Sequence, residues 1–194
     1  MSTSATCGSA GARSTWPPGW CRRRPAPLDE LEPITTLALR QFVRAHSIVP
    51  ELPIAVSIRE FAAVGISGDP AASRGLARAM VAQLATFHAP DDLLVALVIA
   101  GRAKVDWEWA KWLPHMQHPS RVDGAGPMRI MASSLAQIEQ PLGEQLRDRP
   151  RFARNAQPPG EAPHILIVID GGEVSEAEQI ILEEGLAGVT LLDL

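Results

Sequence analysis

The sequence predicts an α/β fold, in which a mostly parallel sheet has helices on both faces. Two uninterrupted apolar runs, 93–99 and 164–169, have the length and composition of strands that are buried on both sides. Segments with apolar residues at helical spacing alternate with strand-like runs along the chain. Such alternation is typical of parallel sheets whose crossover connections are helices. A sheet of this kind binds ligands at the carboxyl ends of its strands, beside helix N-termini.

The composition is that of a globular domain and argues against several other classes. Of the 194 residues, 46% are hydrophobic and 21% are charged, which is a balance that supports a buried core. No apolar run approaches the ~20 residues of a membrane helix, and the N-terminus lacks the apolar stretch of a signal peptide. The two cysteines, Cys7 and Cys21, form no disulfide or metal pattern and fit a reducing compartment.

Charge and composition divide the chain into three parts. Residues 1–27 contain four arginines and no acid, and their Ser, Gly, Ala and Pro content predicts a disordered basic tail. We expect a helix and linker over 28–50 and the α/β domain over 51–194. The remainder of the chain holds 14 basic and 22 acidic residues, a net charge of −8, which argues against nucleic-acid binding. Because the sequence stops inside an apolar strand that needs neighbours, we expect the domain to be truncated at its C-terminus.

Local patterns place the individual elements. Helices are indicated by capping residues followed by apolar stripes, and strands by short β-branched or apolar runs. The predicted elements, in chain order, are a helix from Pro33 to His46, two strands over 52–58 and 61–67 for which a hairpin is considered, a helix capped by Asp69 with Pro70 in its first position, a strand over 93–99, a strand over 128–132, a helix capped by Ser134, a strand over 164–169, a helix capped by Ser175 and a strand from 189.

A first candidate site lies between the strand over 61–67 and the helix that follows it. A phosphate-binding P-loop at this position needs glycines, a lysine and a Ser or Thr. The segment supplies Gly65 and Gly68 but no lysine, and Asp69 places a negative charge where a triphosphate would lie. The proline that follows removes one backbone N–H donor. Arg74 offers a positive charge, but it lies about one turn into the helix.

A second candidate site lies at the end of the strand over 164–169. An apolar strand that ends in an acid, here Asp170, is the Walker B pattern, in which the carboxylate holds magnesium through water. A catalytic glutamate is expected next, but Gly171 follows and Glu173 is displaced by two positions. The two sites together predict a nucleotide-binding fold that lacks working catalytic parts, so we assign no catalytic residue.

Four blocks of sequence carry a resemblance to a known family. The blocks begin at Val49, Arg74, Trp107 and His164 and include the runs VPELPIAVS, RGLARAMVAQLATFHAPDDL, WEWAKWLPHMQHP and HILIVIDGG. Over about residues 28–194 the chain resembles the EccC component of the type VII (ESX) secretion system, an ATPase of the FtsK/SpoIIIE kind. The resemblance is to the degenerate ATPase-like segment between the membrane stalk and the motor domains.

The resemblance implies a role, partners and a location. It implies a non-catalytic domain that couples the membrane anchor to the motor domains during protein export. ATP and magnesium are cofactors of the parent family, and none is expected for this segment. The implied partners are membrane-core components of the secretion complex, other EccC subunits in a hexameric ring, and secreted proteins through the full-length motor. The implied location is the cytoplasmic face of the plasma membrane. Among the motor residues, only Asp170 matches.

Two alternative functions remain open at this point. In the first, the domain is a nucleotide-binding and hydrolysing ATPase that uses Arg74 or Arg78 in place of the missing lysine. In the second, the domain is a DNA-translocating module, since relatives of the FtsK kind move DNA. The acidic body of the chain argues against the second alternative.

A tryptophan-rich segment indicates an interface. On a helix, Trp109 and Trp112 share a face while Trp107 points elsewhere, so burying all three rings requires two contacts. One contact is expected with the sheet of the same domain and the other with a partner surface, while core packing of all three rings is the alternative, and the one favoured on general grounds. His115 and His118 lie three residues apart as a zinc-binding pair would, but no cysteine is near them and prolines indicate a turn. We therefore predict no metal site.

Overall fold

The computed structural model describes residues 5–7, 32–46, 54–154, 162–175 and 185–194, in two compact units. One unit spans residues 6–55 and holds the predicted helix, α1 (Pro33–His46), which has no buried residue. Strands β1 (Ala5–Cys7) and β2 (Ile54–Val56) pair with each other in a two-stranded sheet. Within the described residues, no helix combines the length and the hydropathy that crossing a membrane requires.

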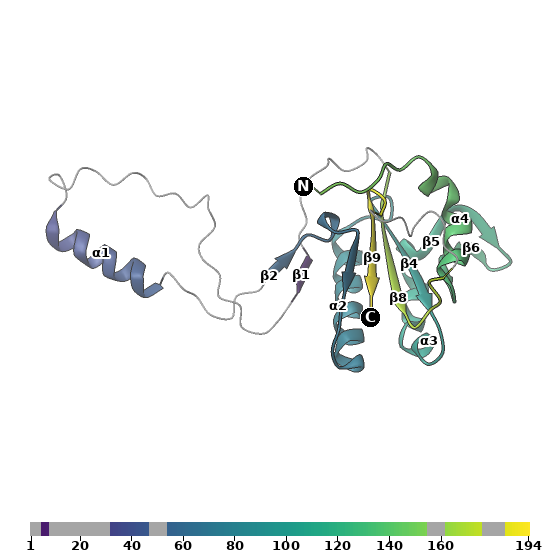
Figure 1. Ribbon diagram of the computed structural model, residues 1–194, viewed down its shortest axis with the longest axis horizontal. Helices are drawn as coiled ribbons and strands as arrows, with labels where there is room; N and C mark the ends of the chain where they lie inside the picture. The colour runs from purple at the N-terminus through teal and green to yellow at the C-terminus, as the bar shows by residue number, and fades with distance from the viewer. Residues whose placement is uncertain (1–4, 8–31, 47–53, 155–161, 176–184) are drawn as a thin grey trace. The chain divides into compact units, whose positions relative to one another are not determined.

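The other unit, residues 1–5 and 56–194, is built on a five-stranded parallel sheet (Figure 1). The strand order across the sheet is β3-β9-β8-β4-β7, and every neighbouring pair is parallel. The central strand β8 and its neighbour β4 are buried along their whole length, as their apolar sequences predict. The strands are β3 (Ala63–Gly65), β4 (Leu93–Ile99), β7 (Met131–Ala132), β8 (His164–Asp170) and β9 (Val189–Asp193).

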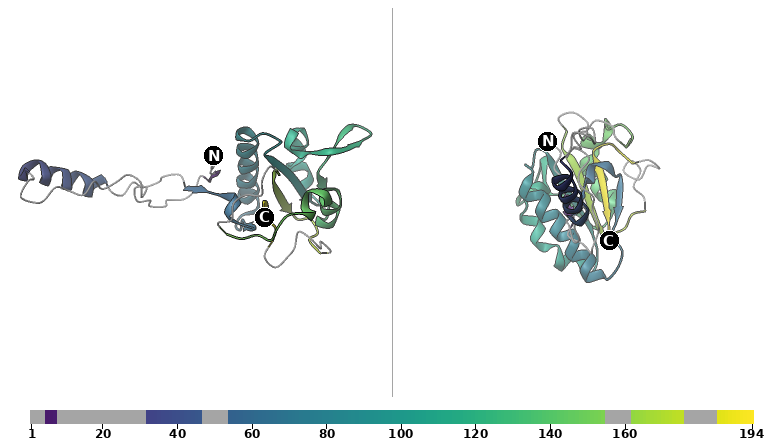
Figure 2. Two further views of the ribbon diagram at one scale, coloured as in Figure 1. Left: turned by 90° about the horizontal axis from the view of Figure 1, so that it is seen from above. Right: turned by 90° about the vertical axis from the view of Figure 1, so that its left-hand side faces the viewer.

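Helices cover both faces of the sheet, which confirms the predicted α/β class (Figures 1 and 2). Along β4, Val95 and Leu97 join one core, to which α2 (Pro70–Phe87) and the short α3 (Ala103–Asp106) contribute. The alternate residues Ala96 and Val98 join the opposite core, to which α4 (Leu135–Arg147) contributes. The sheet therefore forms the middle layer between two hydrophobic cores.

The starts of α2 and α4 follow the predicted capping rules. The Asp69 carboxylate accepts the backbone N–H of Ala72 at 2.9 Å, and Pro70 occupies the first helical position. The Ser134 hydroxyl accepts the backbone N–H of Gln137 at 3.4 Å. Both caps are confirmed, and they fix where each helix begins.

The third predicted cap, at Ser175, precedes residues that lie outside the described part of the chain.

Pro141 lies inside α4 without ending it. The Pro141 carbonyl accepts a hydrogen bond at 2.9 Å from Nε2 of His118, which lies in the strand over 117–123.

The structure corrects the region between residues 52 and 67. Its two strands are short and do not form a hairpin, because β2 pairs with β1 and β3 pairs in parallel with β9. A 3-10 turn over Ile58–Glu60 separates them, and the Ile58 side chain is buried in the core.

A second correction concerns residues 117–132. An antiparallel hairpin forms from β5 (Gln117–Asp123) and β6 (Gly126–Arg129), where the prolines of the region predicted only a turn. The predicted strand over 128–132 is split between β6 and β7 because β6 pairs with β5 in the hairpin whereas β7 pairs with β4 in the parallel sheet. At the other end of the chain, β9 pairs on both sides, with β3 and β8, so both of its neighbours come from within this chain.

Candidate functional site

A cavity of about 450 Å³ lies at the carboxyl ends of β3, β8 and β9, beside the start of α2. Four predicted residues line it, namely Gly65, Gly68, Arg74 and Asp170. The sheet brings them together because β9 separates β3 from β8 by a single strand. The remaining lining residues were not predicted as site residues, and they are Ile66, Ser67, Pro70, Ser73, Asp193 and Leu194.

Asp69 is the predicted site residue that does not line the cavity. Its side chain caps α2 by accepting the Ala72 N–H, and the backbone N–H of Ser73 donates to the Asp69 carbonyl at 2.8 Å. The carboxylate thus takes one N–H donor that a phosphate would use at a helix N-terminus. Pro70 has no N–H to offer.

Arg74 and Asp170 form a bidentate ion pair across the cavity wall. The guanidinium Nε donates to Oδ2 of Asp170 at 2.5 Å, and Nη2 donates to Oδ1 at 2.9 Å. A third nitrogen, Nη1, lies 3.2 Å from Oδ2 of Asp106 at the end of α3. The Trp107 indole Nε1 also donates to Oδ2 of Asp170, at 2.9 Å. One carboxylate therefore joins α2, β8 and the tryptophan segment.

The electrostatics of this pair keep Asp170 ionised. The hydrogen bonds from Arg74, with a smaller contribution from Trp107, hold the pKa of the Asp170 carboxyl below its usual value although burial opposes this. The same contact raises the pKa of Arg74. Asp170 is 5% exposed, so its charge depends on these donors.

The spacing around Arg74 contains a signal that the sequence analysis missed. Counting from Gly68, the P-loop pattern GxxxxGK[ST] places its second glycine at Ser73, its lysine at Arg74 and its hydroxyl residue at Gly75. Arg74 thus occupies the lysine position of a degenerate P-loop. Asp193 was also predictable, because it ends a parallel strand at the same edge of the sheet.

The local backbone differs from a phosphate cradle. In the P-loop pattern, the residues between the two glycines form a loop whose N–H groups surround the phosphates. Here α2 begins at Pro70, so residues 70–73 form the first turn of the helix instead. The Asp69 cap and Pro70 are the local cause of this early helix start.

The residues at this site, as placed, do not fit a magnesium–triphosphate group. The cationic side chain is bonded to Asp170 and Asp106, and both oxygens of Asp170 accept hydrogen bonds. Among the described residues, no three His, Cys, Asp or Glu side chains are grouped as metal ligands. We derive no catalytic step from the cavity.

The three tryptophans have different environments. Trp107 is fully buried, Trp109 packs partly buried against the same core, and Trp112 is 76% exposed. The segment is not one regular helix, because α3 is followed by a 3-10 turn over Glu108–Trp112. Because the helix type changes, the prediction that Trp109 and Trp112 share one face is wrong. Instead, the Trp107 and Trp109 rings stack, with their centroids 6.3 Å apart.

The two histidines of the discounted zinc pair are buried and bond to backbone carbonyls. His115 Nε2 donates to the carbonyl of His88 at 2.9 Å, and His118 Nε2 donates to that of Pro141. His118 Nδ1 accepts the backbone N–H groups of the two residues at 120 and 121. These bonds make both side chains part of the structural core.

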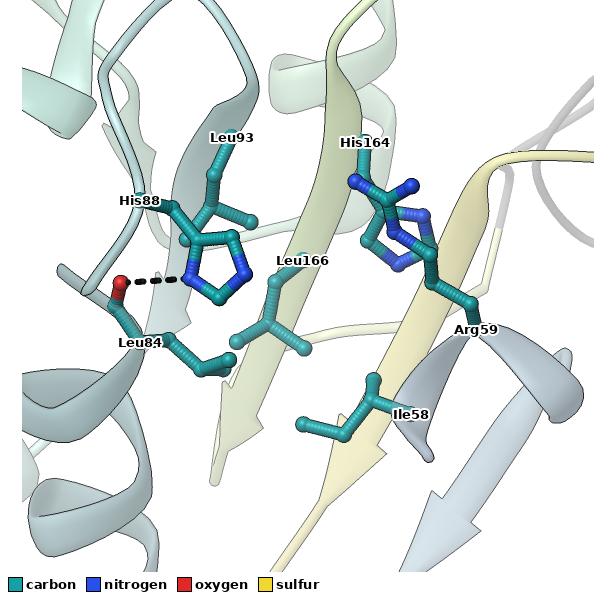
Figure 3. A pocket seen from close by; sticks show the side chains of 7 residues that line it. All are labelled: Ile58, Arg59, Leu84, His88, Leu93, His164 and Leu166. Atoms are coloured by element: carbon teal, nitrogen blue, oxygen red, sulfur yellow. Dashed lines mark hydrogen bonds between the residues drawn. The ribbon is translucent and has the colours of Figure 1, made fainter. Parts of the chain in front are cut away.

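A second, much smaller cavity lies at the amino ends of β4 and β8 (Figure 3). Its volume of about 30 Å³ is too small for a substrate. His164 at its wall is buried, and burial together with the charges of Arg59 and Arg149 lowers the pKa of His164 to about 4. His88 donates through Nδ1 to the Leu84 carbonyl at 2.9 Å. We treat this cavity as a packing feature.

The fold and the site together define an α/β domain of P-loop NTPase-like fold. A degenerate P-loop joins β3 to α2. The buried strand β8, two positions away from β3 in the sheet, ends in the acid Asp170. No model of a known protein family matches the chain.

Three curated relatives identify the family. The chain is 42% identical over 168 residues to ESX secretion system protein EccC of Thermomonospora curvata. The matched region covers 87% of this chain and 12% of that protein. It is 36% identical over 181 residues to ESX-5 secretion system protein EccC5 of Mycobacterium marinum (90% and 13%). It is 33% identical over 170 residues to ESX-1 secretion system protein EccCa1 of Mycobacterium tuberculosis (87% and 21%). The chain belongs to the EccC family of ESX secretion system proteins, and it spans between about one eighth and one fifth of the length of these relatives.

Proposed function

We propose that this chain is a non-catalytic ATPase-like domain of a type VII secretion ATPase. The observation that carries the proposal is the Arg74–Asp170 ion pair, because it occupies both the cation of the degenerate P-loop and the acid of the Walker B position. A triphosphate would have to break this pair, and it would meet a helical turn in place of a cradle. The domain therefore keeps one conformation whether or not nucleotide is present.

A domain that is indifferent to nucleotide is suited to coupling. The Asp170 carboxylate ties α2, β8 and the tryptophan segment together through side chains that are far apart in the sequence. Force applied to one of these elements is passed to the others, because a charged, buried junction is costly to open. The proposed role is to transmit position and force between the membrane anchor and the motor domains of the full-length protein during protein export.

The proposed partners follow from this role. They are membrane-core components of the secretion complex and other EccC subunits in a hexameric ring, at the cytoplasmic face of the membrane. Secreted proteins would engage the full-length motor. Trp112 is the predicted interface tryptophan that is available for such a contact, since it is 76% exposed. The net charge of −8 outside residues 1–27 disfavours DNA as a partner.

Calorimetric titration of this chain with ATP and magnesium tests the proposal directly. We expect no heat of binding at millimolar nucleotide in the unmodified chain. Micromolar affinity, with turnover that is lost in R74A and kept in the control R78A, would establish the hydrolysing alternative. Arg78, the other arginine considered for this alternative, serves as the control because it does not line the cavity and its guanidinium lies 6.0 Å from the centre of the Trp109 ring.

Two further measurements address the coupling role and the DNA alternative. In the full-length protein, D170N is expected to reduce protein export while the ATPase rate of the downstream motor domains remains unchanged. Loss of both in parallel would contradict a purely mechanical role. Gel-shift binding of duplex DNA by residues 28–194 at low salt would support the translocating alternative instead.

A further inference from the structure

We propose that residues 102–112 form a docking surface for an acidic protein segment that carries a large apolar side chain. The proposal does not rest on the proposed function, because it concerns the outer side of this segment rather than the cavity. It holds whether or not the domain binds nucleotide.

The segment combines side chains that are buried in the core with side chains that are exposed to solvent, and we call the exposed ones its outer side. Ala103, Trp107 and Ala110 are buried in the core and fix the segment to the sheet. On the outer side, Val105 is 77% exposed and Trp112 is 76% exposed. A tryptophan ring with this exposure leaves a large apolar area in water, and such rings are enriched at protein interfaces.

The charges on the outer side are not balanced. Its two acids are already paired, Asp106 with Arg74 at 3.2 Å and Glu108 with Lys111 at 2.6 Å. The side chains of Arg102 and Lys104 are exposed and make no hydrogen bond or ion pair with another described residue. Asp106 shares Arg74 with Asp170, so Arg74, Arg102, Lys104 and Lys111 face the three acids Asp106, Glu108 and Asp170. The surface therefore carries a net charge of +1, with Arg102 and Lys104 available to a partner, on a body whose net charge is negative.

The surface is also held in place before any partner arrives. Trp107 is anchored on Asp170, and the Arg129 side chain donates through Nε to the Lys111 carbonyl at 2.7 Å. The Lys111 ammonium lies 5.5 Å from the centre of the Trp112 ring. A pre-organised surface loses little conformational entropy on binding, so a small contact area suffices for a specific complex.

The charge distribution favours a protein segment over an anionic membrane. A membrane is a broad negative plane, and it would meet the acidic body of the domain together with the basic patch. A narrow acidic segment contacts the patch alone, so its attraction to Arg102 and Lys104 is not offset by repulsion elsewhere. An apolar residue of that segment would pack on Trp112 or Val105.

Site-specific photo-crosslinking in the full-length protein, in the cells that produce it, tests the proposal. The substitution Trp112→p-benzoylphenylalanine places the probe on the surface, and the same probe at Val122 is the control. Val122 is 77% exposed in the β5–β6 hairpin. We expect mass spectrometry to show a product from position 112 that joins this chain to an acidic peptide containing a large apolar residue. A yield no greater than at position 122, a basic peptide, or a lipid product would overturn the proposal.

Charge reversal in the same assay tests the electrostatic part. The double substitution R102E/K104E is expected to reduce the crosslink yield at position 112 at least tenfold, while R121E in the hairpin leaves it unchanged. Both variants should retain the melting temperature of the parent, because the three side chains are exposed. An unchanged yield in R102E/K104E, with the fold intact, would overturn the assignment of an acidic partner.

Discussion

The two ends of the parallel sheet bury an ionisable group in opposite ways. At the carboxyl end, Asp170 stays charged because Arg74 and Trp107 donate to both of its oxygens. At the amino end, His164 stays neutral because burial and two nearby arginines disfavour its protonation, and its Nε2 donates to the Thr190 hydroxyl at 3.2 Å. A buried ionisable group is thus tolerated in one of two ways. Either a partner of opposite charge compensates it, or the group is uncharged.

Removing the partner at the carboxyl end should have the largest effect on stability. R74A leaves the Asp170 carboxylate buried with only Trp107 as a donor. We expect the free energy of unfolding to fall by about 3 kcal/mol, near the lower end for broken buried pairs because the Arg74 side chain is 25% exposed. Urea unfolding of R74A, D170A and the double variant measures the coupling. If the two single effects simply add, the pair does not stabilise the fold as described.

Acidification should separate the two ends of the sheet. The pKa of His164 is about 4 in the folded chain against an ordinary value of 6.5, so the unfolded state binds more protons between these values. Stability should therefore fall as the pH drops from about 6.5 to about 4, by about 2 to 3 kcal/mol. The contribution of Asp170, whose pKa is lowered, persists through this window and is lost only at lower pH.

Thermal unfolding across that pH range, with H164Q as the control, checks this prediction. Glutamine keeps a donor for Thr190 but does not titrate, so the slope of stability against pH should flatten in H164Q. An equal slope in both proteins would show that another group is responsible.

The turn after β8 should tolerate no side chain. A Cβ atom on Gly172 would lie 2.5 Å from Cγ1 of Val98 and 2.7 Å from its carbonyl oxygen. We expect the free energy of unfolding of G172A to be about 2 kcal/mol lower than that of the parent, because the added methyl group overpacks against backbone that cannot move freely. The matched change G143A in α4 meets no atom within 4 Å and should gain up to about 1 kcal/mol from helix propensity. Urea denaturation of both variants measures the cost of this close approach, and a G172A variant as stable as the parent would contradict it.

The smallest expected effect concerns the cap beside the cavity. D69A removes the acceptor for the Ala72 N–H and should cost about 1 kcal/mol, whereas D69N should cost only a few tenths. The equivalent change in α4, S134A, should cost about as much, since it removes the same kind of bond. A D69A variant that binds ATP tightly would show that the carboxylate, rather than the helical turn, blocks phosphate.

Predictability differed between local and distant features. The Asp69 and Ser134 caps and the buried strands β4 and β8 follow from residues that are neighbours in the sequence, and the structure confirms them. The hairpin over β5 and β6 was missed because its pairing depends on tertiary contacts, including the bond from His118 to Pro141. The predicted 52–67 hairpin was wrong because β3 finds its partner in β9, more than a hundred residues later.

The candidate site shows the same division. The positions of the degenerate loop and of the strand-ending acid follow from the residues alone, because glycine, proline and capping residues act over a few positions. The pairing of Arg74 with Asp170, which lies 96 residues later, and the further hydrogen bond from Trp107 become visible only in the folded domain. The reason is that ion pairing depends on distance in space, and the order of strands in a sheet is set by packing of the whole domain.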